Sequence, residues 1–306
     1  MNCFKKIVVL YGGQSGEREV SIHSAESVIE VLNRYYPTRA ICLDENQLPS
    51  DLNPSTDIIF PIIHGDFGED GQLQALLEQQ GFVYVGSDSV ASSLCMHKLQ
   101  SKQLARQNGL PVLPAIEVIS GQNLSRSNLE KTLNSTAFVL KPENKGSSLG
   151  VQICPNFDAL QSAWLSVEQG LWMIEPYIYG REITVGILQG QALGVGEICP
   201  QQGFYDFHNK YTPGACSYRF PADLSDQVVQ IIQNIGVEFF KAAHCRDFSR
   251  ADFILDINNQ PWFLEMNTIP GMTDQSLFPK SAAAVGISFD VMIQRIVESA
   301  IAQLKA

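Results

Sequence analysis

Short apolar runs alternate with amphipathic segments along the first third of the chain. The run Lys6–Tyr11 has the composition of a buried strand, ends in a Gly-rich turn, and is followed by a segment with apolar residues at helical spacing. A second strand, Asp57–Ile63, leads through a polar loop into another amphipathic segment. Strand, loop and helix in this order predict an α/β layer. Ligands bind at the carboxyl ends of such strands, so we expect Glu17 and His64 to share one rim if the strands are neighbours. Helix capping for Glu17 and a structural role for His64 are the alternatives.

The segment Ser87–Asn108 predicts one long helix, with Ser87, Asp88 or Ser89 as its N-cap and Gly109 as its end. Lys98 and Lys102 lie four residues apart in this segment and therefore share a helix face. A pair of lysines at that spacing is usually exposed to solvent. The change in composition after this helix indicates a first domain boundary.

The most informative pattern is a predicted hairpin that runs from Arg250 to Asn267. Asn258 and Asn259 favour a two-residue turn, because Asn tolerates left-handed backbone angles. That turn sets Asp252 opposite Glu265 and Arg250 opposite Asn267, all on one face. Facing carboxylates repel each other, and hard oxygen ligands suit magnesium, so this face is a candidate Mg²⁺ site. A solvated polar face on an edge hairpin is the alternative.

Three loops carry further candidate chemistry. The loop 142–150 contains two glycines and two serines after Lys141, a composition that suits phosphate binding but also flexible hairpins. The segment Gln201–Ser217 has no regular period and is long for a connection, which favours a lid with Lys210 and Tyr211 as its reactive side chains. In the loop 268–273, Gly271 would let a backbone N–H approach a ligand.

Composition narrows the class of protein. The chain has 306 residues, enough for two or three domains, and 21 Lys plus Arg against 32 Asp plus Glu. This acidic balance argues against a nucleic-acid or anionic-membrane surface. Seven scattered cysteines predict neither a disulfide framework nor a zinc site, and fit reduced thiols in the cytoplasm. The sequence shows no apolar run of membrane-spanning length and no signal peptide at its start.

Seven separated motifs, taken together, resemble the D-alanine:D-alanine ligase family of the ATP-grasp superfamily, from about Val9 to Phe289. The motifs, in order, are GGQSGEREVSIHSA, HGDFGEDGQLQALLE, KPENKGSSLGV, GREITVGIL, FYDFHNKYT, SRADFILD and LEMNTIPGMT. Their order and spacing across almost the whole chain make chance similarity improbable.

The resemblance implies a three-domain ATP-grasp fold of mixed α/β and α+β class, with ATP held between two antiparallel sheets. The expected domains are 1–88, with the first D-alanine site, 89–178, the central ATP-grasp domain, and 179–306, with the metal site and the lid. It further implies a cytoplasmic homodimer that uses ATP and two Mg²⁺ ions, with Mn²⁺ as a substitute. Its substrates would be D-alanine and ATP, and its product D-alanyl-D-alanine for peptidoglycan synthesis and cell shape.

The resemblance also implies a role for each candidate residue. The residues near the reacting atoms would be Glu17, Ser147, Tyr211, Arg250 and Gly271. Glu17 would hold the ammonium of the first D-alanine, while Arg250 and the Gly271 N–H would stabilise an oxyanion. The substrate-binding residues would be His64, Ser276 and Leu277. The ATP-binding residues would be Lys98, Lys141, Ser148, Glu175 on the adenine side, Glu182 at the ribose, and Lys210. The metal ligands would be Asp252, Glu265 and Asn267.

Three positions depart from the family pattern. His97 stands where Asp is usual, Lys145 where an acidic residue is common, and Pro176 where Lys or Glu is usual beside the adenine. These departures concern nucleotide affinity more than chemistry. The alternatives are a ligase that joins D-alanine to D-lactate or D-serine, another ATP-grasp carboxylate–amine ligase, or a non-catalytic nucleotide-binding protein. Tyr211 resembles the dipeptide-forming type.

Overall fold

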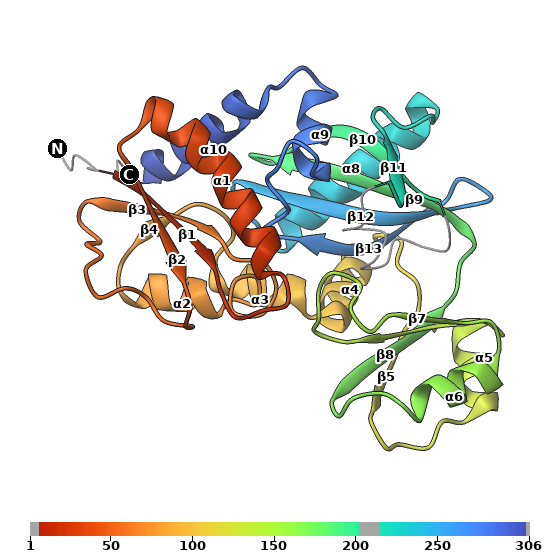
Figure 1. Cartoon of the computed structure of the whole chain (residues 1–306). Coiled ribbons are helices and arrows are strands. Elements are labelled where there is room, and N and C mark those ends of the chain that lie inside the picture. The colour runs from red at the N-terminus through yellow and green to blue at the C-terminus, as the bar shows by residue number, and fades with distance from the viewer. Residues whose placement is uncertain (1–5, 202–213, 304–306) are drawn as a thin grey trace.

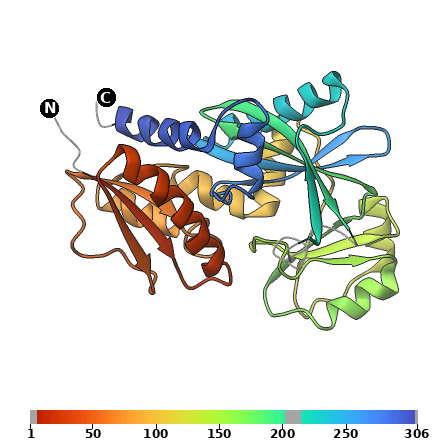
Figure 2. The same ribbon diagram turned by 45° about the horizontal axis from the view of Figure 1, so that its top comes forward.

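The computed structural model describes residues 6–201 and 214–303, and these form three sheets with associated helices (Figure 1). The predicted Lys210 and Tyr211 lie outside the described residues. Figures 1 and 2 place the N-terminal sheet, in red to orange, and the middle sheet, in yellow to green, apart from one another, with the third sheet reaching both.

The first sheet is parallel, as the strand and helix pattern predicts. Its strand order is β2-β1-β3-β4, with β1 (Lys6–Gly12), β2 (Thr38–Leu43), β3 (Asp57–Ile62) and β4 (Val83–Tyr84). Helices α1 (Arg18–Tyr35) and α2 (Gln72–Gln79) follow β1 and β3. Because β1 and β3 are neighbours, the loops that carry Glu17 and His64 lie at the same edge of the sheet.

The middle sheet is antiparallel, in the order β5-β8-β6-β7. Its strands are β5 (Ile116–Ile119), β6 (Phe138–Pro142), β7 (Gln152–Cys154) and β8 (Leu171–Pro176). Helices α5 (Arg126–Leu133) and α6 (Phe157–Trp164) share one apolar core with it. The loop between β6 and β7 is the candidate phosphate-binding loop.

The third sheet is antiparallel, in the order β11-β10-β9-β12-β13. Its strands are β9 (Gly180–Leu188), β10 (Gln191–Pro200), β11 (Cys216–Arg219), β12 (Phe248–Asp256) and β13 (Pro261–Asn267). Side chains of β9 pack on opposite faces: Val185 contributes to the core with α8 (Asp226–Ala242), and Leu188 to the core with α9 (Leu277–Ala283). Helix α10 (Phe289–Gln303) shares that second core and packs against α1, which ties the end of the chain to the first sheet.

The predicted helix 87–108 is wrong in one respect, because the structure contains two helices, α3 (Ser89–Met96) and α4 (Lys98–Gln107). His97 has an extended backbone between them, and the N–H of Lys98 bonds to the carbonyl of Glu143 instead of continuing the helix. Asp88 is the N-cap of α3, since its side chain accepts from the N–H of Ala91. Both helices contact β13 of the third sheet. The domain division 1–88, 89–178 and 179–306 stays a prediction.

The β12–β13 hairpin has the predicted pairs, Arg250 with Asn267 and Asp252 with Glu265, but not the predicted turn. The N–H of Asp256 bonds to the carbonyl of Gln260, so three residues form the turn instead of two. A bulge after Asp252 shifts the register by one residue and restores the pairing at the far end.

Across the described ranges 6–201 and 214–303, no helix combines the length and apolar character needed to cross a membrane.

Candidate active site

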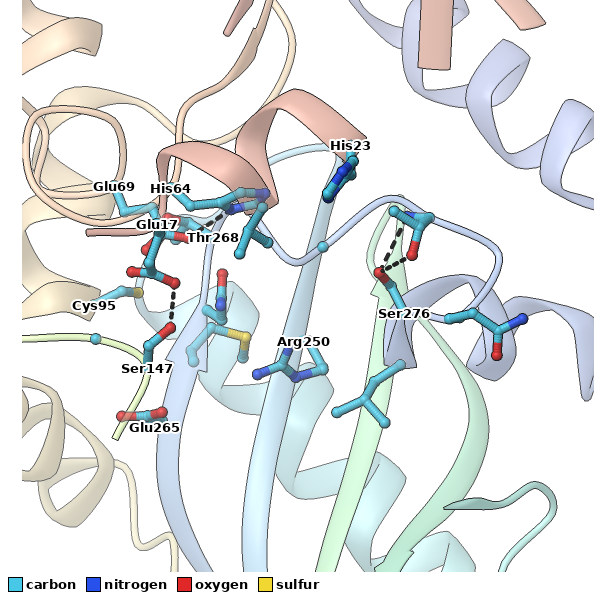
Figure 3. A pocket seen from close by; sticks show the side chains of 18 of the residues that line it. Glu17, His23, His64, Glu69, Cys95, Ser147, Arg250, Glu265, Thr268 and Ser276 are labelled. Atoms are coloured by element: carbon cyan, nitrogen blue, oxygen red, sulfur yellow. Dashed lines mark hydrogen bonds and ion pairs between the residues drawn. The ribbon is translucent and has the colours of Figure 1, made fainter. Parts of the chain in front are cut away.

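A cleft of about 640 Å³ is lined by residues from segments next to each of the three sheets (Figure 3). It is bordered by the loops after β1, β3 and β6, by strands β12 and β13, and by the segment that leads into α9. Ten of the predicted site residues line it, namely Glu17, His64, Lys98, Ser147, Arg250, Glu265, Asn267, Gly271, Ser276 and Leu277. Five other predicted residues that the structure describes do not line this cleft, namely Lys141, Ser148, Glu175, Glu182 and Asp252.

One end of the cleft is acidic and buried. Ser147 donates a hydrogen bond to Glu17, which joins the loop after β6 to the start of α1, and Figure 3 shows the two side chains pointing at each other. His64 Nδ1 lies 3.6 Å from Glu69 Oε1, and its Nε2 lies 3.3 Å from the hydroxyl of Ser24. Glu69 Oε2 also accepts from the N–H of Gly65 at 3.0 Å. Two carboxylates and a histidine thus share a small buried volume.

Electrostatics in this acidic end couple the three groups. Burial raises the pKa of the Glu69 carboxyl, which Glu17 raises further. Burial opposes protonation of His64, but the carboxylates of Glu69 and Glu17 outweigh it and raise the pKa of the imidazole. Glu69 was not among the predicted site residues, although its motif HGDFGEDG was recognised. The signal that identifies it is the tertiary contact with His64.

A second group of charges lies beneath the loop after β6. Lys141 Nζ is 2.5 Å from Glu175 Oε1, and Lys102 Nζ is 2.8 Å from Glu175 Oε2. Lys98 Nζ donates to the carbonyl of Lys145 at 2.5 Å. The prediction that Lys98 and Lys102 face solvent is wrong, because they are 6% and 2% exposed. Burial lowers the pKa of both ammonium groups.

The loop itself has an unusual backbone. Ser147 and Ser148 both have left-handed backbone angles, with φ of 51° and 55°. Such angles are costly for residues other than glycine and concentrate at functional loops. The cost is consistent with a loop shaped for a ligand, as predicted for phosphate oxygens.

The candidate metal face lies on the hairpin. Arg250 forms a two-bond ion pair with Asp252, and Thr184 Oγ1 donates to Asp252 Oδ1 at 2.7 Å. Arg250 and Asp252 side chains are only 11% and 17% exposed, so this is not a solvated outer face. Asn267 Oδ1 accepts from the N–H of Ile269 at 2.9 Å.

The residues present fit a magnesium ion in their chemistry. Among the described residues, no hydrogen bond or ion pair occupies the Glu265 carboxylate, which lies opposite Asp252. Within the same residues there is no cluster of three or more His, Cys, Asp or Glu arranged for a metal. The set consists instead of two carboxylates and an amide oxygen, which leaves coordination positions for water and phosphate, as Mg²⁺ prefers.

The far end of the cleft is formed by the segment before α9. A side chain at Gly271 would place its Cβ 2.8 Å from the hydroxyl oxygen of Ser276, so a substitution there would displace the Ser276 side chain. Ser276 accepts from the N–H of Thr273 at 3.1 Å and pairs with the Thr273 hydroxyl at 2.9 Å. Figure 3 labels Ser276 and marks its hydrogen bonds with dashed lines. Arg250 and Gly271 both line the same cleft.

Comparison with known proteins identifies this arrangement. The sequence model described as "D-ala D-ala ligase C-terminus" matches residues 104–298, and "D-ala D-ala ligase N-terminus" matches residues 37–87. The chain belongs to the D-alanine–D-alanine ligase family. The predicted family and the ATP-grasp fold class are therefore confirmed.

Relatives match over almost their whole length. The D-alanine–D-alanine ligase of Methylacidiphilum infernorum is 38% identical, with 99% of this chain and 97% of that protein aligned. That of Magnetococcus marinus is 40% identical, with 97% of both covered.

Solved structures of similar ligases have a similar fold. The ligase from Bacillus anthracis complexed with ATP has a TM-score of 0.85 at 30% identity, with 98% of each chain covered. The D-Ala:D-Ser ligase VanG from Enterococcus faecalis has a TM-score of 0.80 at 28% identity, covering 97% of this chain and 99% of that one.

Proposed function

We propose that the protein joins two D-alanine molecules into D-alanyl-D-alanine, at the expense of ATP, to supply peptidoglycan synthesis. The observation that carries this proposal is that one cleft is lined by the acidic buried end, by the loop after β6 with Lys98, and by the Arg250–Gly271 end. A ligase needs these three parts in that order: a site for an amino acid, a site for a transferable phosphate, and a site for developing negative charge.

The acidic end suits the first D-alanine. An ammonium group buried there gains the charges of Glu17 and Glu69, while the hydrogen bond from Ser147 keeps the Glu17 carboxylate oriented. His64 lies beside both carboxylates and limits the surplus negative charge when it is protonated. Glu17 therefore recognises the substrate ammonium, and the substrate carboxylate is left facing the phosphate site.

Phosphate transfer activates that carboxylate. Its oxygen attacks the γ-phosphorus of ATP and ADP leaves, which gives an acyl phosphate. Lys98 and Lys141 offset the charge of the phosphate oxygens, Ser148 in the loop covers them, and Glu175 and Glu182 lie toward the nucleoside. Lys210 is proposed to add a further charge from the segment outside the described residues.

Asp252, Glu265 and Asn267 are proposed to hold two Mg²⁺ ions, or Mn²⁺ in their place, which when bound screen the phosphate oxygens. Arg250 also pairs with Asp252. A divalent ion held by Asp252 would share its carboxylate oxygens with that guanidinium.

The amine of the second D-alanine then attacks the acyl carbon, and inorganic phosphate leaves. Negative charge develops on the former carbonyl oxygen, where Arg250 and the N–H of Gly271 are proposed to stabilise it from the same cleft. Ser276 and Leu277 receive the carboxylate of the second substrate. Water would hydrolyse the acyl phosphate, so a lid that excludes it is expected. The predicted lid, Gln201–Ser217 with Tyr211, lies mostly outside the described residues, and its last two residues belong to strand β11.

A second candidate is a ligase that accepts D-serine or D-lactate as the second substrate. Its support is the similarity to VanG, a D-Ala:D-Ser ligase. We favour the dipeptide of two D-alanines, because the curated relatives of higher identity carry that name.

The test is a coupled assay of ADP release with ATP, Mg²⁺ and each of D-alanine, L-alanine, D-serine and D-lactate, with mass spectrometry of the products. We expect D-alanine-dependent ADP release and D-alanyl-D-alanine as the main product, and a large loss in Glu17→Gln. ADP release that ignores D-alanine would overturn the proposal, and a mixed product with D-serine or D-lactate would transfer it to the second candidate.

The family resemblance also supports a cytoplasmic homodimer. Light scattering of the purified protein tests the oligomeric state, and a single monomeric mass at micromolar concentration would contradict it.

A further inference from the structure

Lys102 forms a buried ion pair for which the reaction proposed above has no use. It is 2% exposed, as is Glu175, and the two belong to helix α4 and strand β8. Lys102 Nζ lies 2.8 Å from one oxygen of Glu175, and Lys141 Nζ lies 2.5 Å from the other. One carboxylate is therefore shared between two ammonium groups.

The charges in this trio do not cancel. Burial opposes ionisation of Glu175, but the charges of Lys102 and Lys141 prevail and lower the pKa of its carboxyl to about 2. With Glu175 ionised and both lysines protonated, the trio carries one net positive charge. If Lys102 were neutral, Lys141 and Glu175 would cancel each other, and the field toward a phosphate would fall sharply.

Lys102 is buried and cannot contact a ligand in the cleft directly. Neither it nor its partners Lys141 and Glu175 line the cleft described above, and its other contact is the carbonyl of Leu113, at 3.4 Å. Lys141 is the more exposed of the two lysines, at 9% against 2%. It lies on β6, the strand that runs into the candidate phosphate-binding loop. The influence of Lys102 on a ligand must therefore pass through Glu175 to Lys141.

We propose that Lys102 is a positioning residue for nucleotide phosphates: by sharing Glu175, it holds Lys141 in place while leaving its positive charge available to the phosphate chain. This inference rests on the proposed function of the cleft as an ATP site. It also gives Glu175 a second role, as the anchor of Lys141 in addition to its place on the adenine side.

The test compares nucleotide binding by calorimetry in the full-length protein. Lys102→Met is expected to weaken ATP and ADP binding about tenfold, the equivalent of one charge-assisted contact, and to leave adenosine binding unchanged. Lys102→Arg keeps a positive charge beside Glu175 and is expected to bind ATP within about threefold of the wild type. Arg106→Met, an exposed change one turn further along α4, is the matched control.

Equal losses of ATP and adenosine in Lys102→Met would overturn the inference, because they would indicate a general disturbance of the site. If that variant does not fold, Lys102→Arg decides, and a tenfold loss of ATP binding in it would overturn the inference as well. A wild-type protein that binds no ATP would instead contradict the proposed function. Thermal melts of every variant separate loss of fold from loss of binding.

Discussion

Arg250 and Asp252 form a two-bond ion pair on one face of β12, with Nε 2.9 Å from Oδ1 and Nη2 2.7 Å from Oδ2. Residues two apart on a strand point the same way, so this pairing follows directly from the sequence spacing. The residue proposed to stabilise the oxyanion thus holds a residue proposed to bind metal. Changes at either position test how the two roles divide.

Arg250→Ala is expected to lower kcat about 10²–10³-fold, the usual loss for one oxyanion donor, with a smaller effect on ATP affinity. Steady-state kinetics with D-alanine and calorimetric titration with ATP provide the two numbers. Arg250→Lys is the comparison, because it keeps the charge but loses the planar fork. Equal losses of turnover and ATP affinity in Arg250→Ala would assign the residue to nucleotide binding.

Asp252→Asn and Glu265→Gln should each lower turnover and raise the Mg²⁺ concentration for half-maximal activity about tenfold, since each removes one charged oxygen ligand. Mg²⁺ titrations of initial rate measure the shift, and circular dichroism shows that the fold is intact. Glu117→Gln, at an exposed position on β5, is the control. Normal activity with an unchanged Mg²⁺ requirement in either variant would remove that residue from the metal site.

The hairpin shows how far local sequence rules reach. Alternation along strands and the turn preference of Asn predicted which residues face one another at the metal face, and the pairs are correct. The turn was nevertheless wrong, because Asp256 accepts from the N–H groups of Asn258 and Gln260 and holds a three-residue loop. The bulge compensates for the extra residue. Turn and bulge each shift the register by one, and only packing determines that both occur.

Burial of the lysines was the main failure of sequence reasoning. Lys98 and Lys102 have the spacing of a solvent-exposed pair, yet both are buried because Glu143 and Glu175 come from the distant β6 and β8 region to meet this helix. Helical periodicity cannot reveal partners so remote in sequence. The ligase resemblance identified Lys98 but not Lys102, and Lys210 and Tyr211 lie outside the described residues.

The buried His64–Glu69 pair predicts a pH-dependent stability. The pKa of His64 is raised above its unfolded value of about 6.5, so the folded state binds the proton more tightly. The stabilisation is fully present below that pH and is lost as pH rises through the folded pKa. The raised pKa of Glu69 acts in the same direction. His64→Gln should therefore lower the melting temperature more at about pH 5.5 than at about pH 9.

Thermal melts of the wild type and His64→Gln at the two pH values test this expectation. His23→Gln provides the control, because His23 is exposed on α1. A difference between wild type and His64→Gln that does not change with pH would show that the ion pair contributes nothing to stability.

His97 is a departure from the family that the structure explains. Its Nδ1 lies 2.7 Å from Glu143 Oε2, while Glu143 Oε1 accepts from the N–H of Leu99 at the start of α4. Glu143 thus supplies, from the loop after β6, the capping oxygen that an aspartate in the place of His97 would supply locally. Because Glu143 is only 2% exposed, a second carboxylate beside it would be repelled.

His97→Asp, which restores the usual family residue, is therefore expected to destabilise this protein by about 1–3 kcal/mol and to raise the KM for ATP, since Lys98 begins the same helix. The double variant His97→Asp/Glu143→Ala removes the repulsion and lets the introduced carboxylate cap α4, so it should recover most of both losses. Urea unfolding and ATP kinetics on the two variants measure the effect. If the single variant is as stable as the wild type, His97 and Glu143 are independent, and the structure offers no reason for histidine at this position.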